Sequence, residues 1–364
     1  MRSGIIYGFV LLSIIASSCM KDDELWQRAE VAPADSPSGV FIVNEGNFMY
    51  NNASLSYYDT ETNEVYNDIF FTTNGLPLGD VAISMSIRDS LGYVVVNNSG
   101  KINILDINNF EYRGKITGLT SPRYIHFIND TKAYVSDLYA QAISIINPAL
   151  MELTGSIDLR NNASPYNQHP TEQMVEYGSY VFTNCWSFDN KIMLIDTYDD
   201  SVVDSMEVYL QPRSMVMDRY NSLWVLTDGG YEGNPLGYEA PALMRIDAAT
   251  MSTEMVWRFD KGDWPSGLEL NGRRDTLYFI NGDVYRHAVL SESAPEVFIE
   301  SPYNDSAAAG GGFYGLGVDP YSSEVYVADA IDNVQPGVVY RYSHAAVPVD
   351  TFRVGIMPGS FCFK

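Results

Sequence analysis

The sequence predicts an all-β protein, a β-propeller of seven blades that is closed by pairing its N-terminal and C-terminal strands. Short runs rich in β-branched and aromatic residues alternate with Gly, Asn, Asp and Pro along the chain, which is typical of strands and turns. Similar segments recur from residue 82 to residue 358 in six steps, a mean spacing of 46 residues. No stretch after residue 39 keeps a helical period long enough to predict a helix.

A targeting signal is predicted at the N-terminus, ahead of the folded domain. Arg2 provides a positive charge, and residues 5–15 form an apolar run that is too short to span a membrane comfortably. Three small residues, 16–18, precede Cys19, a pattern that resembles a lipobox with Cys19 as the lipidated residue. An ordinary signal peptide with a chance cysteine is the alternative. Residues 1–18 are therefore predicted to be a lipoprotein signal peptide.

A polar tether is predicted from residue 19 to residue 38. Residues 20–24, Met-Lys-Asp-Asp-Glu, resemble the Lys and acidic residues of lipoproteins exported to the cell surface in Bacteroidetes; a solvated charge run is the alternative. Pro33 and Pro37, without any apolar period, favour a flexible linker. We expect a lipid anchor in the outer membrane, with the domain of residues 39–364 exposed at the cell surface.

Each repeat is predicted to be one blade of four antiparallel strands. It opens with a Pro or a small residue and an inner strand, continues with a buried β-rich strand, and adds a third strand and a more polar fourth. The third strand often ends in an acidic turn, as at Asp106, Asp196 and Asp247. The opening segments are residues 82–87, 122–127, 170–175, 212–217, 265–270, 313–318 and 358–363.

The two ends of the chain are predicted to build the seventh blade together. Residues 40–43, 55–59 and 65–69 supply three strands, and residues 358–364 supply the missing innermost one. Pairing between the chain ends removes the open strand edges that an unclosed ring would expose. Six or eight blades are the alternatives to seven.

The composition excludes several classes of function. With 46 Asp and Glu against 22 Lys and Arg, and a net charge of −24, the protein should repel a phosphate backbone, so we expect no nucleic-acid partner. The 3 Cys and 4 His, without an HExxH or paired-Cys motif, predict neither a disulfide scaffold nor a metal site. We expect no enzyme and no cofactor, because the sequence contains no nucleophile elbow and no distinctive acid pair.

Single histidines, cysteines and one tryptophan are assigned structural roles. His126 and His287 fall on strand patterns, where packed and hydrogen-bonded histidines are expected. Cys185 and Cys362 belong to different blades. Buried free thiols are therefore favoured over a disulfide, which would require the two Cα atoms to lie within reach. Trp224 lies inside a strand pattern and is expected in the core.

A ligand-binding face is predicted where the loops from second to third strand and the connections between blades emerge together. These connections are rich in Asn, Gly, Tyr and Trp. Such a mixture suits a neutral, amphipathic ligand, because aromatic faces supply apolar area and amides supply hydrogen bonds. Turn chemistry alone also favours Asn and Gly. The predicted ligand-binding residues are Asn44, Asn47, Tyr50, Arg123, Tyr139, Trp186, Arg213, Tyr231, Trp264 and Tyr314.

Two of these residues carry positive charge. Arg123 and Arg213 each follow the Pro that opens a blade, so both side chains should point toward the axis or the upper rim of the ring. Each is a candidate for one of two roles: to hold an anionic group of a ligand, or to pair with a carboxylate of a loop.

The start of the propeller resembles a known family. Residues 43–48, Val-Asn-Glu-Gly-Asn-Phe, together with residues 55–59 and the lipoprotein leader, are similar to the YncE-like surface lipoproteins of gut Bacteroidetes, and among them to the BtuG group. The resemblance spans residues 39–364. It implies a seven-bladed propeller that captures a corrinoid, cobalamin or cobinamide, and passes it to a TonB-dependent outer-membrane transporter of the BtuB type.

Two other functions are compatible with the same loops. A surface glycan-binding protein would present an exposed aromatic platform rather than a polar-lined depression, because aromatic rings stack on sugar faces. A scaffold lipoprotein would bind no small ligand. The resemblance favours the corrinoid over both.

Overall fold

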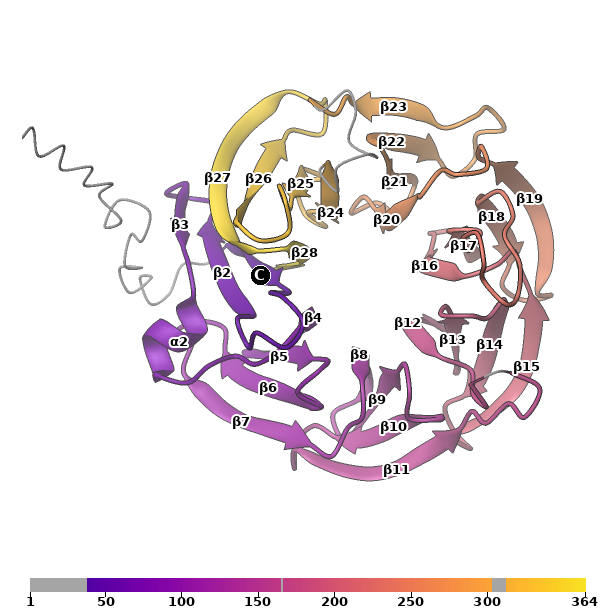
Figure 1. Ribbon diagram of the computed structural model, residues 1–364, viewed down its shortest axis with the longest axis horizontal. Coiled ribbons are helices and arrows are strands. Elements are labelled where there is room, and N and C mark those ends of the chain that lie inside the picture. Colours follow the sequence, from indigo (N-terminus) through magenta and orange to yellow (C-terminus); the bar gives the residue numbers. More distant parts are fainter. Residues whose placement is uncertain (1–37, 165, 303–311) are drawn as a thin grey trace, which may run out of the picture.

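Seven antiparallel sheets of four strands each are arranged in a ring, as Figure 1 shows. The computed structural model describes residues 38–164, 166–302 and 312–364. The predicted fold class and the number of blades are confirmed. The predicted signal peptide and tether, Cys19 included, lie outside the described residues. Within the described ranges, no helix is long and apolar enough to cross a membrane.

Each blade runs from an innermost strand at the axis to an outermost strand at the rim. The closing blade contains, in this order, β28 (Pro358–Phe363), β1 (Gly39–Asn44), β2 (Ser54–Asp59) and β3 (Glu64–Tyr66). Blade 1 contains β4 (Ala82–Arg88), β5 (Leu91–Val96), β6 (Lys101–Asp106) and β7 (Tyr112–Thr117). Blade 2 contains β8 (Pro122–Asn129), β9 (Lys132–Asp137), β10 (Ala142–Asn147) and β11 (Glu152–Asp158). Blade 3 contains β12 (Thr171–Tyr177), β13 (Tyr180–Cys185), β14 (Lys191–Asp196) and β15 (Ser201–Glu207).

The remaining three blades follow in chain order. Blade 4 contains β16 (Pro212–Met217), β17 (Ser222–Thr227), β18 (Ala242–Asp247) and β19 (Ser252–Arg258). Blade 5 contains β20 (Ser266–Leu270), β21 (Thr276–Asn281), β22 (Asp283–Ala288) and β23 (Glu296–Ile299). Blade 6 contains β24 (Phe313–Val318), β25 (Val325–Asp329), β26 (Pro336–Tyr342) and β27 (Pro348–Ile356).

The core lies between neighbouring blades, because each sheet buries both of its faces. Second strands are nearly continuous apolar runs for this reason; in β17 every residue after Ser222 is buried. Trp224 and Leu226 of β17 pack with Leu268 and Phe279 of blade 5. Outer strands such as β11 and β15 are mostly exposed and polar. Trp224 lies in the core, as predicted, and its indole N–H donates to Asp218.

The ring is closed by antiparallel pairing between β1 and β28. Val40 pairs with Phe363 and Ile42 with Phe361. The last residue also takes part, because the Lys364 N–H donates to the carbonyl of Gly39 over 2.9 Å. The predicted closure is therefore confirmed, and β28 is the innermost strand of its blade.

In the turns between third and fourth strands, an aspartate side chain caps backbone N–H groups of the same turn. Carboxylate oxygens accept backbone N–H groups two or three residues later, at Asp106 from Asn108 over 2.9 Å and at Asp247 from Thr250 over 2.7 Å. Such Asx turns satisfy backbone N–H groups where the chain reverses direction. Hydrogen bonds to the ionised form lower the pKa of Asp247. Some of the excess acidic residues therefore serve to stabilise turns.

One predicted strand is shorter than expected. The sequence predicts a strand over residues 65–69, but β3 ends at Tyr66 and a short helix, α2 (Ile69–Asn74), follows it. Asp68 adopts a left-handed conformation with φ 52°, which ends the extended chain. Ile69 and Phe70 of the helix are buried in the cluster between the closing blade and blade 1. Tertiary packing of these apolar residues therefore overrides their strand propensity.

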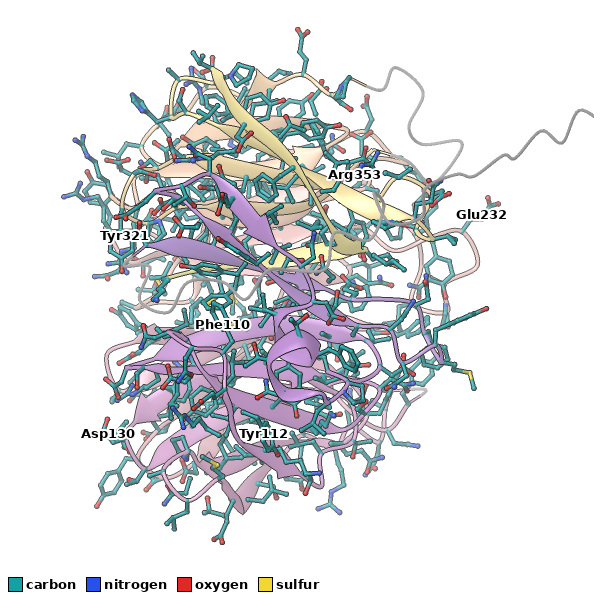
Figure 2. All side chains as sticks on the ribbon, turned by 90° about the vertical axis from the view of Figure 1, so that its left-hand side faces the viewer. Phe110, Tyr112, Asp130, Glu232, Tyr321 and Arg353 are labelled. Carbon is teal, nitrogen blue, oxygen red and sulfur yellow. The ribbon has the colours of Figure 1, made fainter. Side chains whose placement is uncertain are left out.

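The ring has two distinct faces. We call the connection face the one that carries the loops from second to third strands and the connections between blades. The turn face carries the other turns. Figure 2 shows Glu232, from a second-to-third strand loop, on the opposite side of the molecule from the turn residues Asp130 and Tyr321. The chain enters on the turn face, because Gly39 pairs with Asp59, which begins the turn between β2 and β3.

Deletion of residues 358–364 is expected to make the protein aggregate or to lower its free energy of unfolding by several kcal/mol. The deletion exposes the edge of β1 and strips the axis of one inner strand. Solubility and chemical denaturation measure the effect. Deletion of Lys364 alone keeps β28 and serves as the control. An unchanged unfolding midpoint in the longer deletion would contradict the closure.

Candidate functional site

The loops of the connection face contact one another around the ring. The Asn47 side chain of the β1–β2 loop donates to the carbonyl of Asn333 in the β25–β26 loop over 2.6 Å. The Leu210 N–H, between blades 3 and 4, donates to Glu239 of the β17–β18 loop over 2.7 Å. These contacts show that both classes of connection share one face, as the sequence analysis expects.

A β-bulge occurs at the same place in every innermost strand. The register with the second strand shifts so that the second residue has no partner, for example between Pro212 and Ser214 in β16 and between Phe313 and Gly315 in β24. A bulge bends the strand and redirects the unpaired side chain. We call these second residues the inner ring. It consists of Ile83, Arg123, Glu172, Arg213, Gly267, Tyr314 and Gly359.

Two members of the inner ring form an ion pair. The Arg123 Nε lies 2.8 Å from Oε1 and 3.0 Å from Oε2 of Glu172. The two side chains are 17% and 4% exposed. Burial lowers the pKa of Arg123, but the Glu172 charge more than offsets this effect, so the pKa is raised. Arg123 therefore holds a carboxylate of the neighbouring blade, not of a loop.

Glu45 enters the inner ring from the β1–β2 loop. The Tyr314 hydroxyl donates to Glu45 Oε1 over 2.8 Å. Gly359 makes room for this carboxylate, because a Cβ on Gly359 would lie 2.2 Å from Glu45 Oε1. Burial raises the pKa of Glu45, against the lowering effects of Tyr314, Arg123 and Arg213. Gly359, the inner-ring residue of β28, has no side chain, and Glu45 of the same blade fills its place with a carboxylate.

Arg213 differs from Arg123 in its partners. Its guanidinium lies 5.7 Å from the centre of the Trp186 ring, in cation–π geometry. Among the described residues, it forms no hydrogen bond or ion pair. The Trp186 indole N–H donates to Asp228 Oδ2 over 2.8 Å, which fixes the ring. Arg213 is therefore a half-buried cation that lies over an aromatic ring. Without a direct ion pair, its charge still lowers the pKa values of Glu45 and Glu172.

Exposed aromatic side chains surround the inner ring on the connection face. Tyr50 is 76% exposed, Tyr139 60%, Trp264 49% and Tyr231 42%. Exposed apolar area of this kind is a feature of binding surfaces. These four side chains lie in loops of the connection face and are exposed. Their contact with a ligand stays a prediction.

Three rings form a row across blades 3 and 4. The ring centres of Tyr166 and Phe188 are 4.6 Å apart, and those of Phe188 and Tyr231 are 6.2 Å apart. Tyr166 is exposed like Tyr231. Neither Tyr166 nor Phe188 is among the predicted ligand-binding residues. Phe188 thus joins the two exposed tyrosines into one row of contacting rings.

Two predicted asparagines support the loops instead of facing outward. Asn44 is fully buried, and its amide donates to Ser56 over 2.9 Å and to Ser54 over 3.2 Å. It is the last residue of β1, so the strand, not the loop, determines its surroundings. Asn47 is half-buried and accepts from the amide of Asn52 while donating to Asn333. Asn44 therefore does not reach the surface of the connection face.

The histidines on strands are packed, but the hydrogen bonds expected for them are incomplete. The Nε2 atoms of His126 and His287 are buried without a partner among the described residues. Burial lowers the pKa of His126 to about 4, so this side chain is neutral. Cys185 and Cys362 are free thiols, the first buried and the second half-buried. Neither pair of residues joins the inner ring.

Glu269 is a further acid of an innermost strand. It lies on β20, two residues after the inner-ring position, and is half-buried. No described residue forms a hydrogen bond or an ion pair with its side chain. Burial raises its pKa to about 8. Its carboxyl group is therefore partly protonated near neutral pH.

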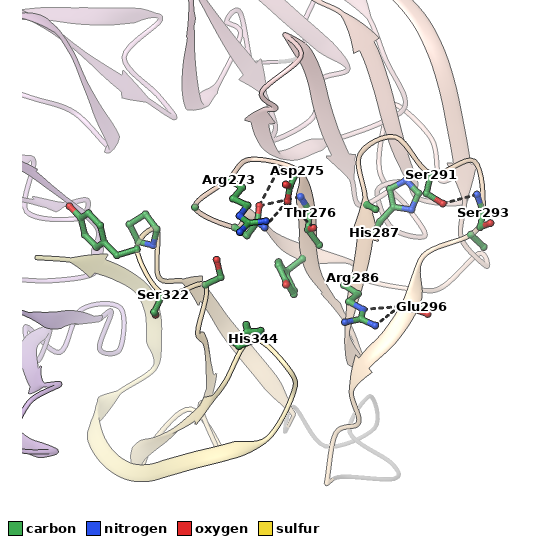
Figure 3. Close-up of a pocket in the computed structure, with 18 residues that line it drawn as sticks. Arg273, Asp275, Thr276, Arg286, His287, Ser291, Ser293, Glu296, Ser322 and His344 are labelled. Atoms are coloured by element: carbon green, nitrogen blue, oxygen red, sulfur yellow. Dashed lines mark hydrogen bonds and ion pairs between the residues drawn. The ribbon is translucent and has the colours of Figure 1, made fainter.

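A cavity of about 880 Å³ lies on the turn face between blades 5 and 6. Figure 3 shows Arg273, Thr276 and His344 around it, with the ion pair of Arg286 and Glu296 at one side. None of the predicted ligand-binding residues lines this cavity. It is open and polar, and the aromatic rim lies on the other face.

The sequence analysis missed Glu172 of the inner ring and Glu45, which reaches into the ring from the β1–β2 loop. A signal for Glu172 was present. Arg123 and Arg213 directly follow the Pro that opens their blades, whereas Glu172 comes two residues after Pro170 because β12 begins at Thr171. Aligning the strand starts, rather than the prolines, places the three side chains at one level.

The family comparison covers most of the chain. A profile of the family described as Domain of unknown function (DUF5074) matches residues 38–352. The chain belongs to this family. The DUF5074 match begins at the first described residue and extends through the first five complete blades and into β27, the last strand before β28. A search of curated proteins finds no match.

Solved structures share the fold of this DUF5074 protein. A quinonprotein alcohol dehydrogenase-like protein from Bacteroides thetaiotaomicron aligns with a TM-score of 0.66 at 16% identity, over 90% of this chain and 78% of that chain. A protein from Lactobacillus plantarum gives 0.64 at 12% identity, over 90% and 98%. A putative 6-phosphogluconolactonase from Bacteroides uniformis gives 0.61 at 13%, over 90% and 99%. At these identities the likeness shows the propeller fold alone.

Replacing Arg123 by Met is expected to lower the free energy of unfolding by about 3–5 kcal/mol, because it leaves the buried Glu172 carboxylate without its partner. Chemical denaturation measures the loss. The control is Arg88→Met, which breaks the exposed ion pair with Asp130 and should cost less than about 1 kcal/mol. Equal effects of the two changes would contradict a buried pair.

Replacing Glu269 by Gln is expected to flatten the dependence of stability on pH. The pKa of about 8 lies above the ordinary value of 4.5, so the contribution of Glu269 is fully present below pH 4.5 and is lost as the pH rises through 8. At pH 9 the variant should therefore be more stable than wild type. Denaturation between pH 5 and pH 9 tests this, with the exposed Glu232→Gln as control. An unchanged slope would show that Glu269 has an ordinary pKa.

Proposed function

We propose that this protein is a non-catalytic, lipid-anchored surface protein whose connection face binds a corrinoid and passes it to a TonB-dependent outer-membrane transporter. One observation carries the proposal: a rim of exposed aromatic rings surrounds an inner ring in which Arg213 is oriented but unpaired among the described residues. The likeness of residues 43–48 to the BtuG group supports the same ligand.

The chemistry of the face suits a corrinoid. The corrin ring is large and flat, carries amide arms, and in cobalamin has one phosphate in its nucleotide loop. Trp264 and Tyr139 offer apolar area with polar edges for the ring and its amides. Arg213 offers a cation for the phosphate. The charges of Glu45, Glu172, Arg123 and Arg213 balance when all are ionised, which suits a ligand with little net charge.

Binding without catalysis agrees with the pairing inside the inner ring. Arg123 pairs with Glu172, and Glu45 accepts from Tyr314. These groups are occupied by each other, so none is poised as a nucleophile with an adjacent base. The inner ring would therefore act as a polar floor of the binding surface, with Arg213 oriented by Trp186.

The tether must allow the connection face to reach a transporter. Ser38 and Lys364 lie on the turn face beside Tyr321, around a hollow of about 550 Å³. A linker of residues 20–38 spans at most about 65 Å when fully extended. A domain of this size is about 50 Å across. With the anchor predicted at Cys19, the propeller can therefore turn its connection face toward the membrane.

The domain of residues 38–364 is expected to bind cyanocobalamin tightly and in a 1:1 ratio. Replacing Arg213 by Met or Trp264 by Ala should each weaken binding by about 1–3 kcal/mol, which is roughly 5- to 150-fold, if each is a central contact. Isothermal titration calorimetry measures both. Tyr321→Ala, on the turn face, is the matched control and should leave the affinity unchanged.

A glycan is the second candidate ligand, and the row of Tyr166, Phe188 and Tyr231 favours it. Aromatic rows stack on successive sugar faces, which requires less polar contact than a corrinoid. Titration with polysaccharides in parallel with cyanocobalamin separates the two. Binding of a polysaccharide that is lost in Phe188→Ala, without binding of cyanocobalamin at micromolar protein, would replace the corrinoid proposal by the glycan.

A further inference from the structure

We propose that His169, Cys185 and Asp189 form a binding site for a divalent metal ion of the zinc type. One imidazole nitrogen, the thiol sulfur and one carboxylate oxygen all lie within 4.8 Å of one another. Cys185 is fully buried, and the side chains of His169 and Asp189 are 15% and 6% exposed. This inference is independent of the corrinoid proposal.

Three separate parts of blade 3 bring the donor atoms together. His169 ends the connection from blade 2, Cys185 is the last residue of β13, and Asp189 lies in the loop before β14. Backbone hydrogen bonds hold this arrangement: the His169 N–H donates to the carbonyl of Leu159 over 2.9 Å, and the Asp189 N–H donates to that of Trp186 over 3.1 Å. The donor set is therefore supported by the fold around it.

The hydrogen bond between the histidine and the aspartate marks where a metal ion would enter. His169 Nδ1 lies 2.6 Å from Asp189 Oδ2, and Oδ1 of the same carboxylate accepts the N–H of Asn190 over 2.7 Å. The ligands of a tetrahedral zinc ion are about 3.3–3.8 Å apart, given bond lengths near 2.0–2.3 Å. Binding therefore needs His169 and Asp189 to separate by about 1 Å, with Cys185 moving inward.

The chemistry of the three donors selects the ion. A thiolate and an imidazole favour zinc over calcium or magnesium, which prefer oxygen ligands. The ion replaces the thiol proton of Cys185, which goes to solvent. The imidazole keeps its single proton on Nε2, so that Nδ1 of a neutral His169 can bind the ion beside the ionised Asp189. With one thiolate, one carboxylate and a neutral imidazole, a Zn²⁺ site has no net charge, which suits its burial. Water completes the fourth position.

The site lies directly beneath the aromatic rim. Trp186 follows Cys185. The backbone N–H of Trp186 donates to the carbonyl of Pro170, next to His169, over 2.9 Å. Phe188 precedes Asp189 in the same loop. A bound ion would therefore cross-link the segments that carry the aromatic row to the end of β13.

Titration of reduced, metal-stripped domain 38–364 with Co²⁺ tests the site. We expect one equivalent to bind with a thiolate-to-cobalt charge-transfer band in the near ultraviolet, and Zn²⁺ to displace it. Ca²⁺ should not compete. Failure to bind Co²⁺ or Zn²⁺ at micromolar concentrations, or equal competition by Ca²⁺, would overturn the proposal.

Variants assign the ligands. Cys185→Ser should abolish the charge-transfer band, while His169→Gln and Asp189→Asn should each weaken zinc binding by more than about 100-fold, since outer-shell partners alone account for about 10- to 100-fold. Cys362→Ser is the matched control, because this other free thiol lies outside the cluster. Circular dichroism and thermal melting of the apo proteins establish that each variant is folded. A band that survives in Cys185→Ser but is lost in Cys362→Ser would refute the assignment.

Discussion

The pairing of the last strand with the first is the interaction on which the rest of this structure depends. Each blade buries both faces against its neighbours, so the blades at the two ends of the chain have incomplete cores until the ring is closed. The chain achieves closure with a single strand, β28, whose partner β1 lies more than 300 residues away in sequence. Glycine at position 317 reflects how tightly this strand is seated, because a Cβ there would lie 2.6 Å from the Cβ of Phe361.

Closure also determines what can happen at the axis. Seven inner strands with a bulge at the same position bring their second residues to a common level. Two arginines and one glutamate come from this ring, and Gly359 leaves the place into which Glu45 reaches. The pairing of Arg123 with Glu172 keeps the buried charges balanced. Arg213 then remains as the cation that lies over the Trp186 ring and forms no direct ion pair among the described residues.

The sequence predicted the architecture well because the period of the repeat is a local property. Blade number, the shared last blade and the core position of Trp224 all follow from strand patterns. Side-chain roles at the axis were harder to predict. Asn44 lies in a run of loop-like residues but ends a strand and is buried, and Glu172 was hidden because its strand begins one residue after the proline.

The remaining features depend on tertiary packing that no local pattern encodes. Residues 69–74 form a helix because Ile69 and Phe70 pack between two blades. The cluster of His169, Cys185 and Asp189 has no motif, because a blade connection brings the histidine back to a strand end 16 residues later. Such clusters can be recognised only from the three-dimensional arrangement of the blades.

Hydrogen–deuterium exchange of the domain with and without cyanocobalamin tests the central claim most directly, because it locates the ligand on one of two opposite faces. The account predicts slower exchange on the connection face and no change on the turn face. The informative peptides cover residues 45–53, 186–190, 228–241 and 259–265 on the first face, and 271–275 and 319–324 on the second. Protection confined to the turn-face peptides, or no protection at saturating ligand, would contradict it.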